Sequence, residues 1–147
     1  MITRAIKNAF EMKKHRKWDK TFWAFDIHNT IIVPNYSRME IPKQFYPLAK
    51  EVLQIISKRR DIVRILYTCS HPEEIEQYLD YFRENKIYFD YVNENPAVTN
   101  DHGCYDQKLY FNVLFEDKAG FDPLKDWAKV NNVLKEYPEL AKTSIVL

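Results

Sequence analysis

Short apolar runs alternate with amphipathic segments along most of the chain. The apolar runs lie at residues 21–26, 62–67, 87–92 and 109–115. Runs of this length, with apolar residues at consecutive positions, are typical of strands that are buried on both faces of a sheet. Apolar residues recur at helical spacing in four other segments, residues 1–18, 44–59, 72–85 and 124–136. The alternation predicts an α/β fold, a three-layer sandwich with a mainly parallel sheet.

Local signals add detail to this outline. Ser70 is a candidate N-cap of the helix that follows it, and Pro72 lies near the first turn of that helix. The last helix is expected to turn four residues toward the core, Leu124, Trp127, Val130 and Leu134. Six aromatic side chains are also expected in the core, Trp23, Tyr88, Phe89, Tyr110, Phe111 and Trp127. Residues 143–147 fit either a short edge strand or a tail.

Composition restricts the classes of protein to consider. With 147 residues, 46% of them hydrophobic, the chain is large enough for one domain with a substantial core. It contains only two glycines and no glycine-rich P-loop motif, which argues against a P-loop kinase. Cys69 and Cys104 lack the spacing of a disulfide framework or a zinc site, and Asp101 and His102 supply no second pair of zinc ligands. Because no apolar run reaches membrane-spanning length, we expect a cytoplasmic protein without a membrane partner.

The charge is uneven along the chain, although the net charge is only +1. Residues 1–20 hold most of the basic excess, with Arg4, Lys7, Lys13, Lys14, Arg16, Lys17 and Lys20. We therefore divide the chain into a basic N-terminal helix or arm, residues 1–20, and an α/β domain, residues 21–147. Two interpretations of the basic segment are open: a terminal helix with a solvated charged face, or a contact for nucleic-acid phosphates.

Polar side chains follow three of the predicted strands. Asp26 comes directly after the first strand, Thr68 after the second, and Glu116 and Asp117 after the fourth, while Lys108 precedes the fourth. Because ligands of parallel sheets collect at the carboxyl ends of the strands, we expect these groups to face one site. A carboxylate can attack phosphorus or hold Mg²⁺, and a hydroxyl and an ammonium group can bind phosphate oxygens. The set predicts a metal-assisted phosphoryl-transfer site.

Four motifs in this order resemble those of the haloacid dehalogenase-like (HAD) phosphohydrolase superfamily, over roughly residues 21–130. Phe25–Thr30 resembles its first motif, usually Asp-x-Asp-Gly-Thr after a hydrophobic strand, and Leu66–Thr68 resembles the second. Lys108 fits the third motif and Phe115–Asp117 the fourth. The stretch from Lys108 to Ala119 is also similar to small HAD-like proteins of bacteria and phages. The resemblance implies a Rossmann-like sheet, and the loops after Thr30 and at 93–107 are too short for a cap domain.

The resemblance implies an aspartyl-phosphate mechanism with Mg²⁺ as cofactor. Asp26 would be the nucleophile and a metal ligand, and His28 would add its backbone carbonyl to the ion. Asp117 would be the direct metal ligand of the acidic pair, while Glu116 would act through water. Together these four residues are the predicted metal site.

The resemblance also implies how the substrate is bound. Thr68 and Lys108 would hold the phosphoryl group, with Lys86 and Lys118 as alternatives to Lys108. Without a cap domain the site is open, which favours either a phosphorylated small molecule or the phosphorylated end of a nucleic acid as partner.

His28 departs from the family pattern, because the family normally has an aspartate there as general acid and base. An imidazole can serve in acid–base catalysis near neutral pH, which keeps Asp26 and His28 together as the predicted catalytic pair. Two functions follow from this departure. The chain is a magnesium-dependent phosphomonoesterase, or it is a catalytically impaired relative that binds metal, phosphate or nucleic acid without turnover.

Overall fold

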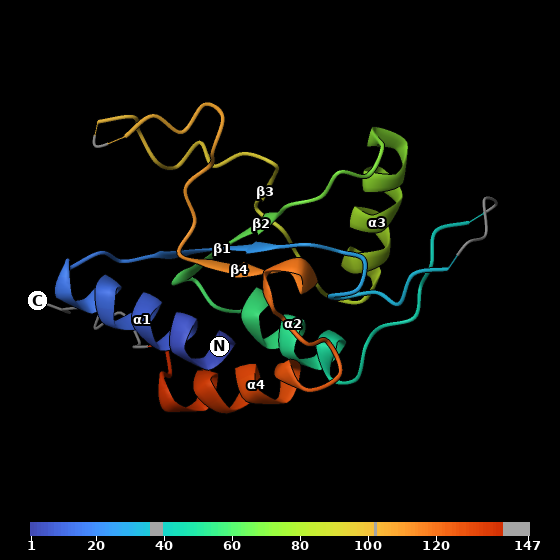
Figure 1. Ribbon diagram of the computed structural model, residues 1–147, viewed down its shortest axis with the longest axis horizontal. Coiled ribbons are helices and arrows are strands. Elements are labelled where there is room, and N and C mark those ends of the chain that lie inside the picture. Colours follow the sequence, from blue (N-terminus) through green and yellow to red (C-terminus); the bar gives the residue numbers. More distant parts are fainter. Residues whose placement is uncertain (36–39, 102, 140–147) are drawn as a thin grey trace, which may run out of the picture.

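The computed structural model describes residues 1–35, 40–101 and 103–139, and it shows an α/β fold around a four-stranded sheet (Figure 1). All strands are parallel, and their order across the sheet is β3-β2-β1-β4. Their bounds are β1 (Thr21–Phe25), β2 (Ile62–Leu66), β3 (Tyr91–Val92) and β4 (Val113–Phe115). The predicted fold class is thereby confirmed, whereas the question of an edge strand at residues 143–147 falls outside the described residues.

The two central strands form because their residues can be buried on both faces. Every residue of β2 is buried, and in β1 only Phe22 is partly exposed. β1 pairs with β2 over its whole length, from Thr21 opposite Ile62 to Phe25 opposite Leu66. At the carboxyl end, the backbone N–H of Asp26 donates to the carbonyl of Phe115 at 2.9 Å. The ends of β1 and β4 are thus tied together where the predicted site begins.

The helices pack on one face of the sheet. They are α1 (Ile2–His15), α2 (Ala49–Ser57), α3 (Pro72–Glu84) and α4 (Asp126–Glu136), and all contribute to one apolar cluster that contains Trp23 and Phe25. Figure 1 shows α1, α2 and α4 together on the same side of the sheet. Helix α1 buries Ile2, Ile6 and Phe10 in this cluster, so this part of the basic N-terminal segment packs against the rest of the chain.

The opposite face of the sheet is covered by the crossover segment, which connects β3 to β4 and is described over residues 93–101 and 103–112. Leu109 and Phe111 of this segment pack against a second apolar cluster formed by Ala24, Val63 and Ile65. Figure 1 shows the segment running over the sheet on the side away from α1 and α4. The three layers are therefore helices, parallel sheet and an irregular crossover.

The outer strands, β3 and β4, are shorter than the apolar runs predict. Backbone groups that would extend the strands form hydrogen bonds with side chains or with the end of a helix instead. The N–H of Ile87 donates to Phe82 at the end of α3, and the N–H of Tyr88 donates to the hydroxyl of Ser57. Before β4, the Asn112 side chain accepts the N–H of Phe22 at 2.8 Å, in place of a backbone partner. Tyr88, which was expected in the core, is 48% exposed.

Two helix starts also differ from the predictions. His71 and not Ser70 is the N-cap residue of α3, because the Ser70 hydroxyl is hydrogen-bonded to Thr68 instead. Helix α4 begins at Asp126, whose carboxylate accepts the N–H of Asp122 at 2.8 Å. Leu124 therefore precedes the helix and is 67% exposed, contrary to the expectation that it faces the core.

Within the described parts of the chain, no helix combines the length and the apolar character needed to cross a membrane.

Candidate functional site

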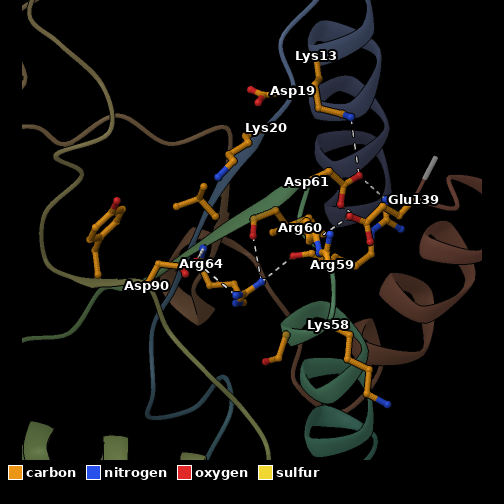
Figure 2. A pocket seen from close by; sticks show the side chains of 14 residues that line it. Lys13, Asp19, Lys20, Lys58, Arg59, Arg60, Asp61, Arg64, Asp90 and Glu139 are labelled. Atoms are coloured by element: carbon orange, nitrogen blue, oxygen red, sulfur yellow. Dashed lines mark hydrogen bonds and ion pairs between the residues drawn. The ribbon is translucent and has the colours of Figure 1, made fainter. Parts of the chain in front are cut away.

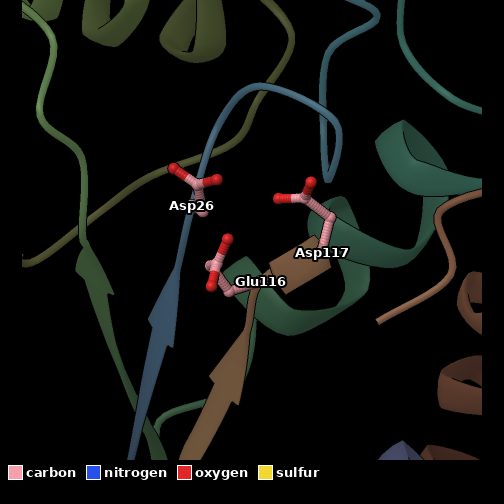
Figure 3. Close-up of side chains that lie close together, drawn as sticks. All are labelled: Asp26, Glu116 and Asp117. Carbon is pink, nitrogen blue, oxygen red and sulfur yellow. The ribbon is translucent and has the colours of Figure 1, made fainter. Parts of the chain in front are cut away.

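Three carboxylates meet at the carboxyl ends of β1 and β4. Asp26 follows β1 directly, and Glu116 and Asp117 follow β4 (Figure 3). One carboxylate oxygen from each lies within 4.8 Å of the others, and all three residues are half-buried. All three donors are carboxylate oxygens, the ligand type that Mg²⁺ and Ca²⁺ prefer. By the chemistry of its donors, the cluster fits a divalent cation of this class.

A short turn after β4 presents the acidic pair. The 3₁₀ helix η1 (Asp117–Ala119) starts at this point, and the Glu116 carboxylate accepts the N–H of Lys118 at 3.0 Å. Gly120 ends the turn with φ of 102°, a conformation that residues with a side chain rarely adopt. The turn therefore fixes the backbone of the acidic pair at the edge of the sheet.

The electrostatics of the cluster are unfavourable for Asp26 as a carboxylate. Burial, followed by the negative charges of Glu116 and Asp117, raises the pKa of Asp26 from 3.8 to about 6, while the Ile27 amide and Lys118 act in the opposite direction. Like charges that are close together and partly shielded from water disfavour ionisation, and a cation between them removes this cost. The fold alone therefore disfavours the charged form of Asp26.

A cavity of about 510 Å³ opens above the cluster. Its lining comes from all four strand ends and consists of Asp26, His28, Asn29, Tyr67, Thr68, Cys69, Asn93, Glu116, Asp117 and Lys118. Of the predicted site residues, the structure therefore brings together Asp26, His28, Thr68 and the acidic pair. Lys108 is exposed in the crossover segment and does not line this cavity. Lys118, the alternative that follows the acidic pair, does.

Thr68 is held in place by Asn93, a residue that the motifs did not single out. The Asn93 side chain accepts the N–H of Thr68 and donates to its carbonyl, both at 2.8 Å. Asn93 follows β3 and has φ of 54°, a conformation that asparagine tolerates better than most residues. A polar residue directly after the third apolar run was the signal in the sequence that could have identified it.

His28 is paired with Tyr78 of α3. The Nε2 atom of His28 lies 2.7 Å from the Tyr78 hydroxyl, and the two rings meet edge to face. Burial lowers the pKa of His28, against the opposite effect of Glu74. Burial, with a further contribution from Glu74, raises the pKa of the fully buried Tyr78. At neutral pH the pair is therefore uncharged, with the tyrosine protonated.

The comparisons with known proteins bear on the fold. No protein-family model matches the chain, and no curated protein matches it. Among solved structures it is similar to a conserved protein from Bacteroides thetaiotaomicron, with 22% sequence identity and a TM-score of 0.61. The similarity covers 81% of this chain and 93% of that chain. At this identity the likeness shows the fold alone, an α/β protein with a parallel sheet.

Proposed function

We propose that the protein is a magnesium-dependent phosphomonoesterase of the HAD type that acts through an aspartyl-phosphate on Asp26. The observation that supports this proposal most strongly is the meeting of Asp26 with Glu116 and Asp117 at one edge of a parallel sheet. The order of the elements agrees with the motif order of the sequence. A carboxylate that only ended a strand would not need two further carboxylates beside it, since their charges oppose its ionisation.

In the proposed reaction the Asp26 carboxylate attacks the phosphorus of a phosphomonoester, and the bond from phosphorus to the alcohol oxygen breaks. The departing oxygen takes a proton, and water then attacks the acyl phosphate, which releases inorganic phosphate and restores Asp26. Mg²⁺, held by Asp26, Asp117 and the His28 carbonyl with Glu116 acting through water, would neutralise charge on the phosphoryl oxygens. We assign the exchange of these two protons to His28, which would give one to the departing oxygen and take one from the attacking water.

For the phosphoryl oxygens we propose Thr68 and Lys118. Thr68 lines the cavity, and its backbone is fixed by Asn93. Lys118 lines the same cavity and favours the charged form of Asp26, which Lys108 does not. We therefore transfer to Lys118 the role that the sequence motif suggested for Lys108.

The cavity admits a substrate whose phosphoryl end is bound and whose other part stays outside the cavity. The loops beside it are too short for a cap, so the site is open. We propose a phosphorylated small molecule or the phosphorylated end of a nucleic acid as substrate.

Phosphate release from a generic aryl phosphate tests this proposal. We expect release with Mg²⁺ and none after chelation of the metal. Asp26→Asn is expected to lower the rate by at least about 10³-fold, because it removes the nucleophile. Asp80→Asn is the matched control, since Asp80 is exposed on α3 in a surface pair with Arg83. A rate that Asp26→Asn leaves unchanged would refute the proposed mechanism.

The bond between His28 and Tyr78 favours a second candidate, a relative that binds phosphate and turns over slowly or not at all. Among the described residues, His28 is the only partner of the Tyr78 hydroxyl, and this hydroxyl stays protonated. If Tyr78 donates to Nε2, the imidazole has no free nitrogen with which to take a proton from water. The phosphoryl group would then stay on Asp26, and release of the aryl alcohol would stop after about one equivalent per site, whereas a true phosphatase continues to turn over.

His28→Asp separates the two candidates, because it restores the carboxylate of the family pattern at this position. An impaired binding protein is expected to gain steady-state turnover from this substitution. If His28→Asp leaves the rate unchanged or lower, the histidine is not the defect.

A further inference from the structure

The amino-terminal ends of β1 and β2 carry a second hollow, at the opposite end of the sheet from the acidic cluster. Two adjoining cavities form it, with volumes of about 770 Å³ and 460 Å³. Asp19 and Lys20 line both cavities, which places the two next to each other. β1 is five residues long, which separates this hollow from the acidic cluster by about 17 Å. We call the two cavities together the basic groove.

The floor of the groove is structural. Arg59 donates to both carboxylate oxygens of Asp61, from Nε at 2.8 Å and from a terminal nitrogen at 2.6 Å (Figure 2). Arg64 is 9% exposed, and one of its terminal nitrogens donates to the carbonyls of Ile56, Arg59 and Ile62, each at 3.0 Å. These arginines close the end of α2 and fix the turn before β2. The two arginines therefore shape the groove. Because most of their donors are used in these hydrogen bonds, few are left for a ligand.

The rim carries cations that the fold does not use. Lys20, Lys58 and Arg60 are exposed, and none forms an ion pair with any residue that the structure describes. Figure 2 shows their side chains around the Arg59–Asp61 pair. Surface cations without a partner are common singly, but here three of them surround one hollow. Asp19 and Glu139 on the same lining offset part of this charge.

Aromatic rings line the other half of the groove. Trp18 is 37% exposed, and the Arg16 guanidinium lies 4.9 Å from the centre of its ring. Tyr110 meets Trp18 edge to face at 6.4 Å, and Tyr105 meets Tyr110 in the same way at 5.5 Å. All of these residues line the smaller cavity. The groove therefore places cations and aromatic rings in two neighbouring cavities.

We propose that the basic groove binds a segment of single-stranded nucleic acid. Unpaired bases stack on exposed aromatic rings, while lysine and arginine at the rim bind the phosphates between them. A single strand fits this arrangement better than a duplex, because the bases of a duplex are stacked on one another and cannot reach Trp18. The proposal is independent of the proposed phosphatase activity, since it uses none of the residues at the acidic cluster.

Point substitutions are the appropriate test, because removing α1 would remove Ile2, Ile6 and Phe10 from the core. Binding of the full chain to labelled oligothymidylate and oligouridylate of about 12 nucleotides is measured by fluorescence anisotropy. An unlabelled duplex serves as competitor. We expect both single strands to bind and the duplex to compete poorly. Affinity for one strand type alone would assign the groove to DNA or to RNA.

Three variants locate the site. Lys20→Glu together with Arg60→Glu is expected to weaken binding by about tenfold or more and to reduce the salt dependence by about 1.4 in log–log slope. Trp18→Ala is expected to weaken binding by about 5- to 150-fold through lost stacking. Lys125→Glu is the control, because Lys125 is an exposed cation at the start of α4, on another part of the surface.

The outcome is decisive in each direction. Absence of binding at low salt, equal weakening by Lys125→Glu, or tighter binding of the duplex would each overturn the proposal. Circular dichroism of the variants verifies their fold. As a second readout, quenching of tryptophan fluorescence by the oligonucleotide is expected in the wild type and is expected to be largely lost in Trp18→Phe, since Trp23 and Trp127 are buried.

Discussion

Asp26 and Asp61 are both aspartates at strand ends, but they lie at opposite ends of the sheet and in opposite surroundings. Asp61, before β2, accepts two hydrogen bonds from Arg59 and lies 3.7 Å from the ammonium group of Lys13. Asp26, after β1, faces two other carboxylates. The negative charge of Asp61 is neutralised by cationic side chains of the fold. The negative charges around Asp26 are not neutralised in this way. The difference separates a structural aspartate from one that is a candidate for function.

The largest expected effect on stability comes from removing the neutralised carboxylate of Asp61. Asp61→Ala leaves Arg59 buried without its carboxylate, and loss of one partner of a buried ion pair costs about 3–5 kcal/mol of the free energy of unfolding. Urea denaturation at neutral pH measures this cost. A loss below about 1 kcal/mol would show that the pair behaves as an ordinary surface ion pair.

Removal of the Asp26 carboxylate is expected to change stability in the opposite direction, as a gain. Asp26 has a pKa of about 6 in the folded chain against 3.8 for the free side chain, so its charged form costs stability above about pH 6 and costs none below about pH 4. Asp26→Asn removes this cost. Because the site is half exposed, we expect a gain of only about 1–2 kcal/mol at pH 7.5 without metal.

Thermal unfolding of Asp26→Asn and wild type across pH 4 to 8 measures this gain. The difference is expected to shrink toward zero as the pH falls below about 4. A destabilised Asp26→Asn protein at pH 7.5 would mean that the carboxylate serves the fold, as Asp61 does.

A smaller effect is expected at the histidine pair. Tyr78→Phe keeps the buried ring but removes its hydrogen bond to His28, which is expected to cost about 1 kcal/mol of stability. If Tyr78 blocks Nε2 in the wild type, release of the aryl alcohol by Tyr78→Phe is expected to continue beyond one equivalent per site. Tyr81→Phe is the control, because the Tyr81 hydroxyl donates to Lys43 and does not contact His28. Release of the aryl alcohol that stops after one equivalent in both variants would show that Tyr78 does not block the histidine.

The sequence predicts the acidic side of the site better than the remainder. Asp26 and the pair Glu116 and Asp117 could be found because each set comes at the end of an apolar strand, and parallel strands bring such positions to one edge. Lys108 and Lys118 could not be ranked in this way, since both are near the fourth apolar run and only the 3₁₀ turn brings Lys118 to the cavity. Tyr78 was not identifiable, because a buried aromatic on a helix is usually core.

In the fold, too, the sequence predicts some parts and not others. The two central strands and all helices follow from hydrophobic periodicity. The shortness of β4 does not, because it depends on the Asn112 side chain taking a hydrogen bond from Phe22. The covering of the second sheet face by Leu109 and Phe111 of the crossover segment does not follow either, because periodicity gives no signal for a layer without regular structure.

The central claim is that Asp26, Glu116 and Asp117 share one divalent cation. Calorimetric titration of the wild type and of Asp117→Asn with Mg²⁺ tests this most directly, with Asp80→Asn as the control. The account predicts one site per chain in the wild type and in the control, and binding weakened by at least about tenfold in Asp117→Asn. Absence of Mg²⁺ binding by the wild type, or equal binding by Asp117→Asn, would contradict it.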